Sequence, residues 1–253
     1  MPVSAAARRA LTSLAGLGLV VLAWELVHAA GWLGKNVPSI GSVAAAFGDG
    51  TSRSALVSAA RVTGGEAVRG FVAGLVCAMA AGAVAVVVPH LRRGLDQLAT
   101  FLNSVPLIAL GPVLLATVAR QTVPVAMSAV AVFFTIYVGT TTGLSRVPPA
   151  PTDVFQAFGA RRWQRLVRLQ VPAAIPVIVT ALKVAMPIAI VGAIIGEWFG
   201  TQGGLGPVML AAMGEFQIPM LWAAAVSAVG LSLVLYGVMA GVEALTDRRF
   251  RSA

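Results

Sequence analysis

Long apolar runs constrain this chain more than any other feature of its sequence. A helix needs about 20 predominantly apolar residues to cross a hydrocarbon core roughly 30 Å thick. With 58% hydrophobic and 11% charged residues, the 253-residue chain is too apolar for a water-soluble fold. It is predicted to be an all-α polytopic membrane protein, one transmembrane domain over residues 1–253 with its core at about 60–245. The six expected transmembrane helices lie near residues 10–30, 66–88, 98–119, 123–144, 175–199 and 219–243.

The third of these stretches is interrupted by Pro106, Gly111 and Pro112. A prolyl ring removes a backbone donor and clashes with the carbonyl one turn back. Such a break persists in a bilayer only where protein or a water-filled cavity covers the freed carbonyl groups. The third helix is therefore predicted to be kinked or short.

The basic residues are distributed unequally between the two sides that six spans would define. The positive-inside rule assigns the richer side to the cytoplasm, which places both termini there. The first stretch is interpreted as a retained span, because Glu25 and the length of the run fit a signal peptide poorly. The richer side carries Arg8, Arg9, Arg92, Arg93, Arg146, Arg161, Arg162, Arg165, Arg168, Arg248, Arg249 and Arg251, and the other side carries Lys35, Arg53, Arg61 and Arg120.

A short polar stretch, "DVFQAFGARRWQRLVRLQVPAAIP", lies between two apolar runs at residues 153–176. Asp153 can cap a short helix, Gly159 permits a turn, and the residues after it favour a second helix that is expected to stop at Pro172. Helical spacing would place Arg161, Arg165 and Arg168 on one side, and Trp163, Leu166 and Val167 on the other. Two interpretations follow: an interfacial helix with its arginines on lipid phosphates, or a docking surface for a cytosolic partner.

This stretch resembles the cytoplasmic signature of the membrane-spanning permease subunits of bacterial binding-protein-dependent ABC importers. That signature is Glu-Ala-Ala, three residues, Gly, nine residues, Ile, one residue and Leu-Pro. Gly159, Ala160 and Pro172 match it as residues, whereas the Glu-Ala-Ala is replaced. The resemblance covers nearly the whole chain. It implies that the cytoplasmic loop 146–174 couples the chain to an ATPase through Asp153, Phe155, Gly159, Ala160, Arg161, Arg162, Trp163, Arg165, Leu169 and Pro172.

Three further segments resemble the nitrate, sulfonate, taurine and pyrimidine-precursor group of these permeases. They are "PLIALGP", the acidic-then-glycine segment "GEWFGTQGGLG", and "VPSIGSV" at residues 37–43. The resemblance leans toward a pyrimidine, riboflavin-like or sulfonate solute. It also marks a candidate translocation path or gate at Pro106, Ala109, Pro112, Glu197, Gln202 and Gly204.

Two charged residues in the fifth apolar run invite separate interpretations. Glu197, near its outer end, is either a solvated or capped interfacial residue or part of a gate or of a binding-protein contact. Lys183, about four turns away, is too distant to pair with Glu197 and is expected to extend its charge toward the interface.

The resemblance implies a transport subunit rather than an enzyme. Its expected partners are a cytosolic ABC ATPase that uses ATP and Mg²⁺, a periplasmic or lipoprotein solute-binding protein, a second permease copy, and the lipids of the bacterial cytoplasmic membrane. "GTQGGLG" lacks the Lys and Ser/Thr of a P-loop and is interpreted as a flexible turn near the outer mouth. No metal, bound cofactor or nucleic-acid partner is expected, because no residue cluster has metal-ligand spacing.

Two alternative functions remain open from the residues alone. An ion-coupled secondary transporter would show internal symmetry and ion sites at broken helices near the membrane midplane. A membrane scaffold that couples the ATPase of a vitamin transporter would also carry short cytoplasmic arginine helices. The order of the six spans, the signature spacing and "PLIALGP" favour the permease.

Overall fold

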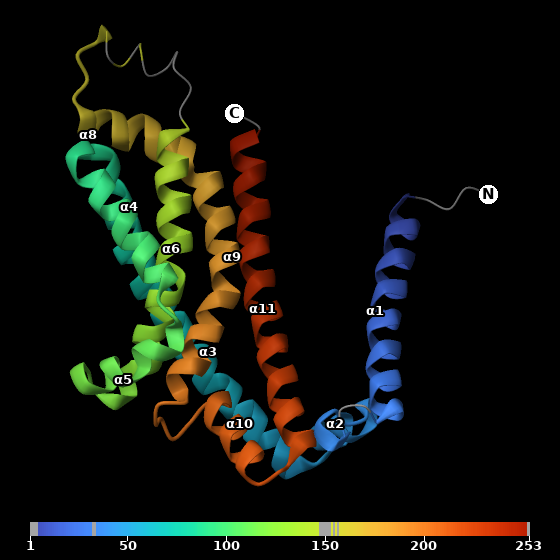
Figure 1. The fold of residues 1–253 in the computed structure, drawn as a ribbon. Coiled ribbons are helices and arrows are strands. Elements are labelled where there is room, and N and C mark those ends of the chain that lie inside the picture. The colour runs from blue at the N-terminus through green and yellow to red at the C-terminus, as the bar shows by residue number, and fades with distance from the viewer. Residues whose placement is uncertain (1–4, 32–33, 147–152, 154, 156, 252–253) are drawn as a thin grey trace. The chain divides into compact units, whose positions relative to one another are not determined.

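The computed structural model describes residues 5–31, 34–146, 153, 155 and 157–251, and this part of the chain contains helices and turns but no strand. The all-α prediction is confirmed (Figure 1). The longer helices are α1 (Ala5–Ala30), α2 (Ile40–Gly48), α3 (Gly50–Val87), α4 (Pro89–Ser104), α5 (Leu107–Thr117), α6 (Val123–Ser145), α9 (Val171–Glu197), α10 (Leu205–Gly214) and α11 (Ile218–Arg251). The short elements are η1 (Gly34–Asn36), η2 (Arg120–Thr122), α8 (Arg162–Arg165) and the π-helical segment η3 (Leu166–Gln170).

The chain divides into two compact units. The first comprises Met1–Val57 and Val208–Val226, and the second comprises Ser58–Pro207 and Ser227–Ala253. The helices α3, α10 and α11 each pass from one unit into the other.

Among the described residues there are four to five candidate membrane spans, where the sequence predicted six. Four single helices are long and apolar enough to cross a bilayer, and α4 with α5 forms a bent pair that could count as a fifth. The first expected stretch contributes only the shorter apolar helix Gly18–Ala30 within the described residues. The four long helices occupy Gly50–Val87, Arg120–Ser145, Trp163–Glu197 and Ile218–Arg249.

The third expected stretch is broken, as its prolines predict. The axes of α4 and α5 differ by 101°. The break lies at Val105, whose extended backbone (φ −73°, ψ 125°) is the conformation that a following proline favours. Pro112, by contrast, is accommodated inside α5. The kink is therefore confirmed, and Pro106 rather than Pro112 defines its position.

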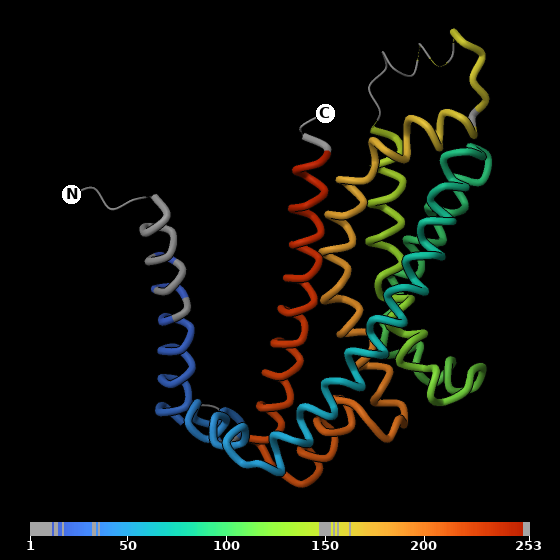
Figure 2. Tube along the Cα trace, turned by 180° about the vertical axis from the view of Figure 1, so that it is seen from behind, coloured from blue at the N-terminus to red at the C-terminus, as the bar shows by residue number. Residues whose placement is uncertain are grey.

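The second unit is organised around α6 and α9, which run side by side in both views (Figures 1 and 2). Small residues let the two backbones approach, as is common between helices in membranes. A Cβ atom at Gly192 would lie 2.8 Å from the Ser128 Cα, and one at Gly143 would lie 3.1 Å from the Ala174 Cβ. Tyr137, buried in the same core, donates a hydrogen bond of 2.7 Å to Asp96 of α4.

The first unit is held together by polar side chains of α1. The indole of Trp24 donates to the Pro38 carbonyl (2.8 Å), and the Glu25 carboxylate accepts from the Ile40 N–H at the start of α2 (2.8 Å). The Trp24 ring also lies 4.5 Å from that of Trp222, centroid to centroid. Glu25 therefore has a structural role, since it satisfies a free donor of a helix N-terminus.

Candidate functional site

The polar stretch after α6 forms a tight turn at Gly159. This glycine has φ +69°, a left-handed conformation that L side chains rarely adopt. The Ala160 N–H donates to the Phe155 carbonyl at 2.9 Å, the bond that closes a Schellman helix end. The next helix begins at once, because the Gln164 side chain accepts from the Arg161 N–H (2.8 Å) as one arm of a capping box. The turn predicted at Gly159 is therefore present, and backbone bonds fix its shape.

The second helix does not stop at Pro172, so that prediction is wrong. From Trp163 to Glu197 the chain is one helix of 35 residues. The segment η3 widens the turn before the proline, and the Val171 N–H bonds to the Leu166 carbonyl five residues back. A widened turn moves backbone carbonyls away from the prolyl ring, which would clash with the residue four positions earlier in a regular α-helix.

The side chains around the turn only partly follow the predicted two-faced pattern. Leu166 is buried against Leu144, Ala174 and Ile178. Trp163, expected beside it, is 64% exposed, and Phe158 is 87% exposed. The turn thus presents two large aromatic side chains that no described part of the chain covers.

The predicted coupling residues are placed as follows. Arg165 is half-buried and lines a small cavity with Val86 and Pro89. Residues 147–152, 154 and 156 of the predicted loop, and the side chain of Arg162, lie outside the described part. Asp153, Gly159, Arg161, Arg168 and Pro172 are exposed, and Phe155, Ala160 and Leu169 are half-buried.

At the opposite end of α9, Glu197 is almost completely buried, with 1% of its surface exposed. Its carboxylate accepts from the Gly206 N–H (2.6 Å). Gly204, at φ +103°, lies directly against the same carboxylate, where a Cβ atom would overlap its oxygens. The glycine-rich segment is therefore packed around a buried carboxyl group. The expectation of a flexible turn is wrong, because Gly204 packs directly against the Glu197 carboxylate. The interpretation of Glu197 as a solvated interfacial residue is also wrong, because its side chain is buried.

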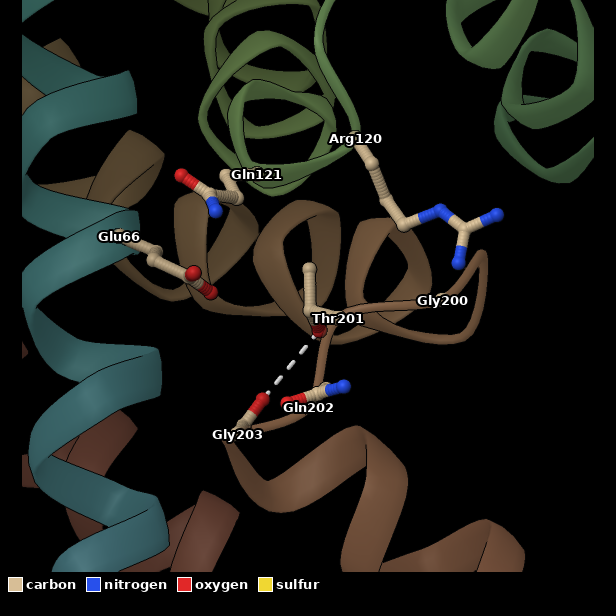
Figure 3. A pocket seen from close by; sticks show the side chains of 7 residues that line it. All are labelled: Glu66, Arg120, Gln121, Gly200, Thr201, Gln202 and Gly203. Atoms are coloured by element: carbon tan, nitrogen blue, oxygen red, sulfur yellow. Dashed lines mark hydrogen bonds between the residues drawn. The ribbon is translucent and has the colours of Figure 1, made fainter.

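A cavity of about 400 Å³ lies beside this segment (Figure 3). Glu66 of α3 and Gln121 of η2 point into it, and Arg120 extends along Gly200 on its far side. Carboxylate, guanidinium, amide and hydroxyl groups thus meet in one place, an arrangement that can hydrogen-bond a polar solute. The cavity is lined by Glu66, Arg120, Gln121, Gly200, Thr201, Gln202 and Gly203.

The predicted path or gate residues divide between two places. Gln202 lines the cavity, and Glu197 and Gly204 lie at the base of the loop that forms its wall. Pro106, Ala109 and Pro112 are exposed on α5 and do not line the cavity. Sequence reasoning missed Glu66, Arg120 and Gln121, because no motif links α3 and η2 to the glycine-rich segment. In the sequence, Arg120 is informative only for the positive-inside rule, as one of the few basic residues on the less basic side.

Lys183 is paired with a residue of another helix, a contact that the sequence did not indicate. Its ammonium group forms a salt bridge with Glu243 of α11. Thr180 also donates to Glu243 (2.8 Å), and Lys183 lies 5.7 Å from the Tyr236 ring centroid. The contact joins residues 60 positions apart in the sequence, which is why no local pattern indicates it.

Comparison with known proteins identifies the class. Residues 70–252 match the family model described as binding-protein-dependent transport system inner membrane component. The chain belongs to this family of ABC transporter permeases. Family membership favours the permease over the ion-coupled transporter and the vitamin-transporter scaffold.

Two curated relatives share about a quarter of the aligned residues with this chain. The chain is 25% identical over 135 residues to a probable ABC transporter permease protein of Haemophilus influenzae, covering 53% of this chain and 55% of that protein. It is 27% identical over 153 residues to the riboflavin transport system permease protein RibX of Chloroflexus aurantiacus, covering 60% of this chain and 57% of that protein. The matches thus span little more than half the length of these relatives. Membership of the nitrate, sulfonate, taurine and pyrimidine-precursor group therefore stays a prediction.

The fold itself is that of a chain in a solved ABC transporter. Two crystal forms of the inward-facing MetNI methionine ABC transporter contain a chain that superposes with TM-scores of 0.68 and 0.69. Each match covers 78% of this chain and 99% of the other, at 16% and 17% identity. At this sequence identity, the structural similarity is evidence for the fold alone.

Proposed function

We propose that this chain is the membrane-spanning subunit of an ABC importer, in which it forms the translocation path for a small organic solute while a separate subunit hydrolyses ATP. The observation that carries the proposal is the turn at Gly159, which exposes Phe158 and Trp163 beside Arg161. Exposed aromatic side chains next to arginine are typical of the residues that dominate protein interfaces.

The geometry of this turn suits the transmission of movement. Backbone and capping hydrogen bonds fix it, so a partner that displaces it would displace the attached helix. That helix is continuous from Trp163 to Glu197 and ends at the loop that borders the cavity. A rigid-body movement of α9 would therefore connect ATP hydrolysis at one end to the cavity at the other.

The solute side of the proposal rests on the cavity and on one relative. The cavity offers Glu66, Arg120, Gln121 and Gln202 to a polar solute, with Glu197 and Gly204 supporting its loop. A riboflavin transport permease among the relatives supports a small organic solute. Pro106, Ala109 and Pro112 are proposed to belong to the path through the exposed face of α5.

The remaining parts of the assembly are proposed on family grounds. They are a second permease copy, two ATPase subunits with ATP and Mg²⁺, and an extracytoplasmic solute-binding protein. The chain would lie in the bacterial cytoplasmic membrane with both termini in the cytosol, and would bind no cofactor, metal or nucleic acid of its own.

Purification of the tagged chain from native membranes in mild detergent tests this proposal. Mass spectrometry would identify an ABC ATPase that copurifies with the parent chain, and its ATP hydrolysis would be measured in the purified complex. A variant that lacks residues 153–168 should lose the ATPase. Phe216→Ser is the matched control, since Phe216 is an equally exposed aromatic residue (84%) outside the turn.

The same variants distinguish a docking surface for the ATPase from an interfacial helix that binds lipid phosphates. If no ATPase copurifies with any form, while ATPases of other transporters survive the same detergent, the coupling assignment is wrong. Retention of the ATPase by the deletion variant, together with weaker binding of the purified variant to anionic vesicles, would instead support an interfacial role for the arginines.

A further inference from the structure

Two buried carboxyl groups meet behind the wall of the cavity. Glu66 of α3 is 6% exposed and Glu197 of α9 is 1% exposed. The two side chains lie close enough for a hydrogen bond between them. Two ionised carboxylates at such a separation in a buried site repel each other strongly, because little solvent screens their charges.

The hydrogen bonds around the pair leave one acceptor on each side chain without a donor. The Glu197 carboxylate accepts from Gly206 at Oε2 and lies within hydrogen-bonding reach of the Thr63 hydroxyl. Glu197 Oε1 and Glu66 Oε2 are buried and have no donor among the described residues. A solute in the cavity would not satisfy these two atoms, because both are closed off from solvent. Two carboxylate oxygens are acceptors only, so they can satisfy each other only when a proton lies between them.

No cation neutralises the pair directly. The salt bridges of the described residues include neither Glu66 nor Glu197. Arg69, one turn along α3 from Glu66, is exposed and donates to the Gly65 carbonyl (3.1 Å). Arg120 lies across the cavity against Gly200. Arg69 favours a single negative charge on the pair without supplying the missing donor.

We propose that Glu66 and Glu197 bind one shared proton, and that this proton fastens the glycine-rich loop to α3. The remaining contacts support the same role. Thr63, one turn before Glu66 on the same face of α3, accepts from the Leu205 N–H (2.8 Å). Loss of the proton would leave two adjacent buried charges and would loosen the loop that forms the cavity wall. The pair is thus a proton-binding site at the edge of the cavity, with Glu66 belonging to both.

Single amide substitutions in the purified chain test this proposal. Glutamine carries an N–H donor where the shared proton would be and keeps the pair at one negative charge. Glu66→Gln and Glu197→Gln should each melt within about 2 °C of the parent at neutral pH. Glu66→Leu should melt lower by roughly 5 °C or more, since it leaves Glu197 charged without a partner. Glu243→Gln is the matched control, and it should be destabilised because Lys183 loses its carboxylate.

The proposal also predicts that the stability of the chain decreases as pH rises. Near neutral pH the folded pair would hold a proton that the unfolded chain has released, so the stability of the parent should fall as pH rises. Both single Gln variants should lack this part of the fall. Infrared spectroscopy with ¹³C-labelled glutamate should detect a protonated carboxyl group in the parent that disappears in either Gln variant.

Three results would overturn the proposal. The first is destabilisation of both Gln variants to the level of Glu66→Leu. The second is the absence of a protonated carboxyl signal in the parent at neutral pH. The third is stability that depends on Na⁺ at fixed pH in the parent and not in the Gln variants, since a cation would then occupy the place assigned to the proton.

Discussion

The two ends of the helix that runs from Trp163 to Glu197 are held in place in different ways. At one end, the turn at Gly159 is exposed, rich in arginine and aromatic side chains, and fixed by backbone and capping bonds. At the other end, the loop after Glu197 is fixed by two buried side chains, Thr63 of α3 and Glu197 of α9. One helix of 35 residues connects them.

This difference in internal contacts indicates which end of the helix is available to bind another subunit. The loop after Glu197 finds nearly all its contacts within the chain, with one proton completing them in our proposal. The turn at Gly159 leaves Phe158 and Trp163 uncovered in the described part of the chain. Substitutions in the loop should therefore change the stability of the chain itself, whereas substitutions in the turn should change association with another subunit.

Gly204→Val should have the largest effect on stability. A valine there would adopt a strained left-handed backbone at φ +103° and overlap the Glu197 carboxylate. These two penalties together predict a loss of roughly 3–5 kcal/mol in the free energy of unfolding. Denaturant unfolding in detergent would measure it. Gly203→Val is the control, because a Cβ atom there meets Val62 at an ordinary 3.5 Å; equal losses in the two variants would contradict the packed loop.

Thr63→Val should cost less, about 1–3 kcal/mol, because it leaves the buried Leu205 N–H without an acceptor while keeping the side-chain volume. The same unfolding experiment applies. Thr100→Val removes a comparable hydroxyl from the exposed face of α4, where the bond is local to the helix. If Thr63→Val were as mild as Thr100→Val, the loop would not be fastened to α3 as the structure indicates.

The sequence predicted the parts of this comparison that local chemistry determines. Apolar run lengths indicated the helices, Pro106 indicated the break, and Gly159 indicated the turn. Each of these features depends on the backbone properties of one or a few residues, and those properties do not change with the tertiary contacts around them.

The contacts between distant helices could not be predicted in this way. Glu66 and Glu197 are separated by most of the helices of the second unit, and Lys183 and Glu243 by 60 positions. A single sequence contains no signal for such pairs. The failure at Pro172 is different: a widened helical turn accommodates the proline, and that choice depends on how Leu166 packs against Leu144 and Ile178.

Gly159→Val should lower stability by only about 1–2 kcal/mol, from the left-handed backbone alone. A side chain there meets nothing within 4 Å, so no steric overlap adds to this backbone strain. Its main effect should be on ATPase copurification, because the turn must change shape to relieve the strain. Gly159→Asn, which tolerates φ +69°, should behave like the parent. Equal copurification of the ATPase with the Val and Asn variants would show that this conformation does not matter for docking.

Trp163→Ser should have the smallest effect on the chain and still separate it from its partner. Trp163 is 64% exposed, so its removal should change the free energy of unfolding by no more than about 0.5 kcal/mol. An aromatic anchor at an interface typically contributes 2 kcal/mol or more, and affinity for the ATPase should therefore fall at least about tenfold. Titration of the purified ATPase against the chain in nanodiscs would measure this, with Phe216→Ser as the exposed aromatic control. Unchanged affinity in Trp163→Ser would exclude this aromatic side chain from the interface. A large loss of stability would mean that the turn, like the loop after Glu197, is held by contacts within the chain.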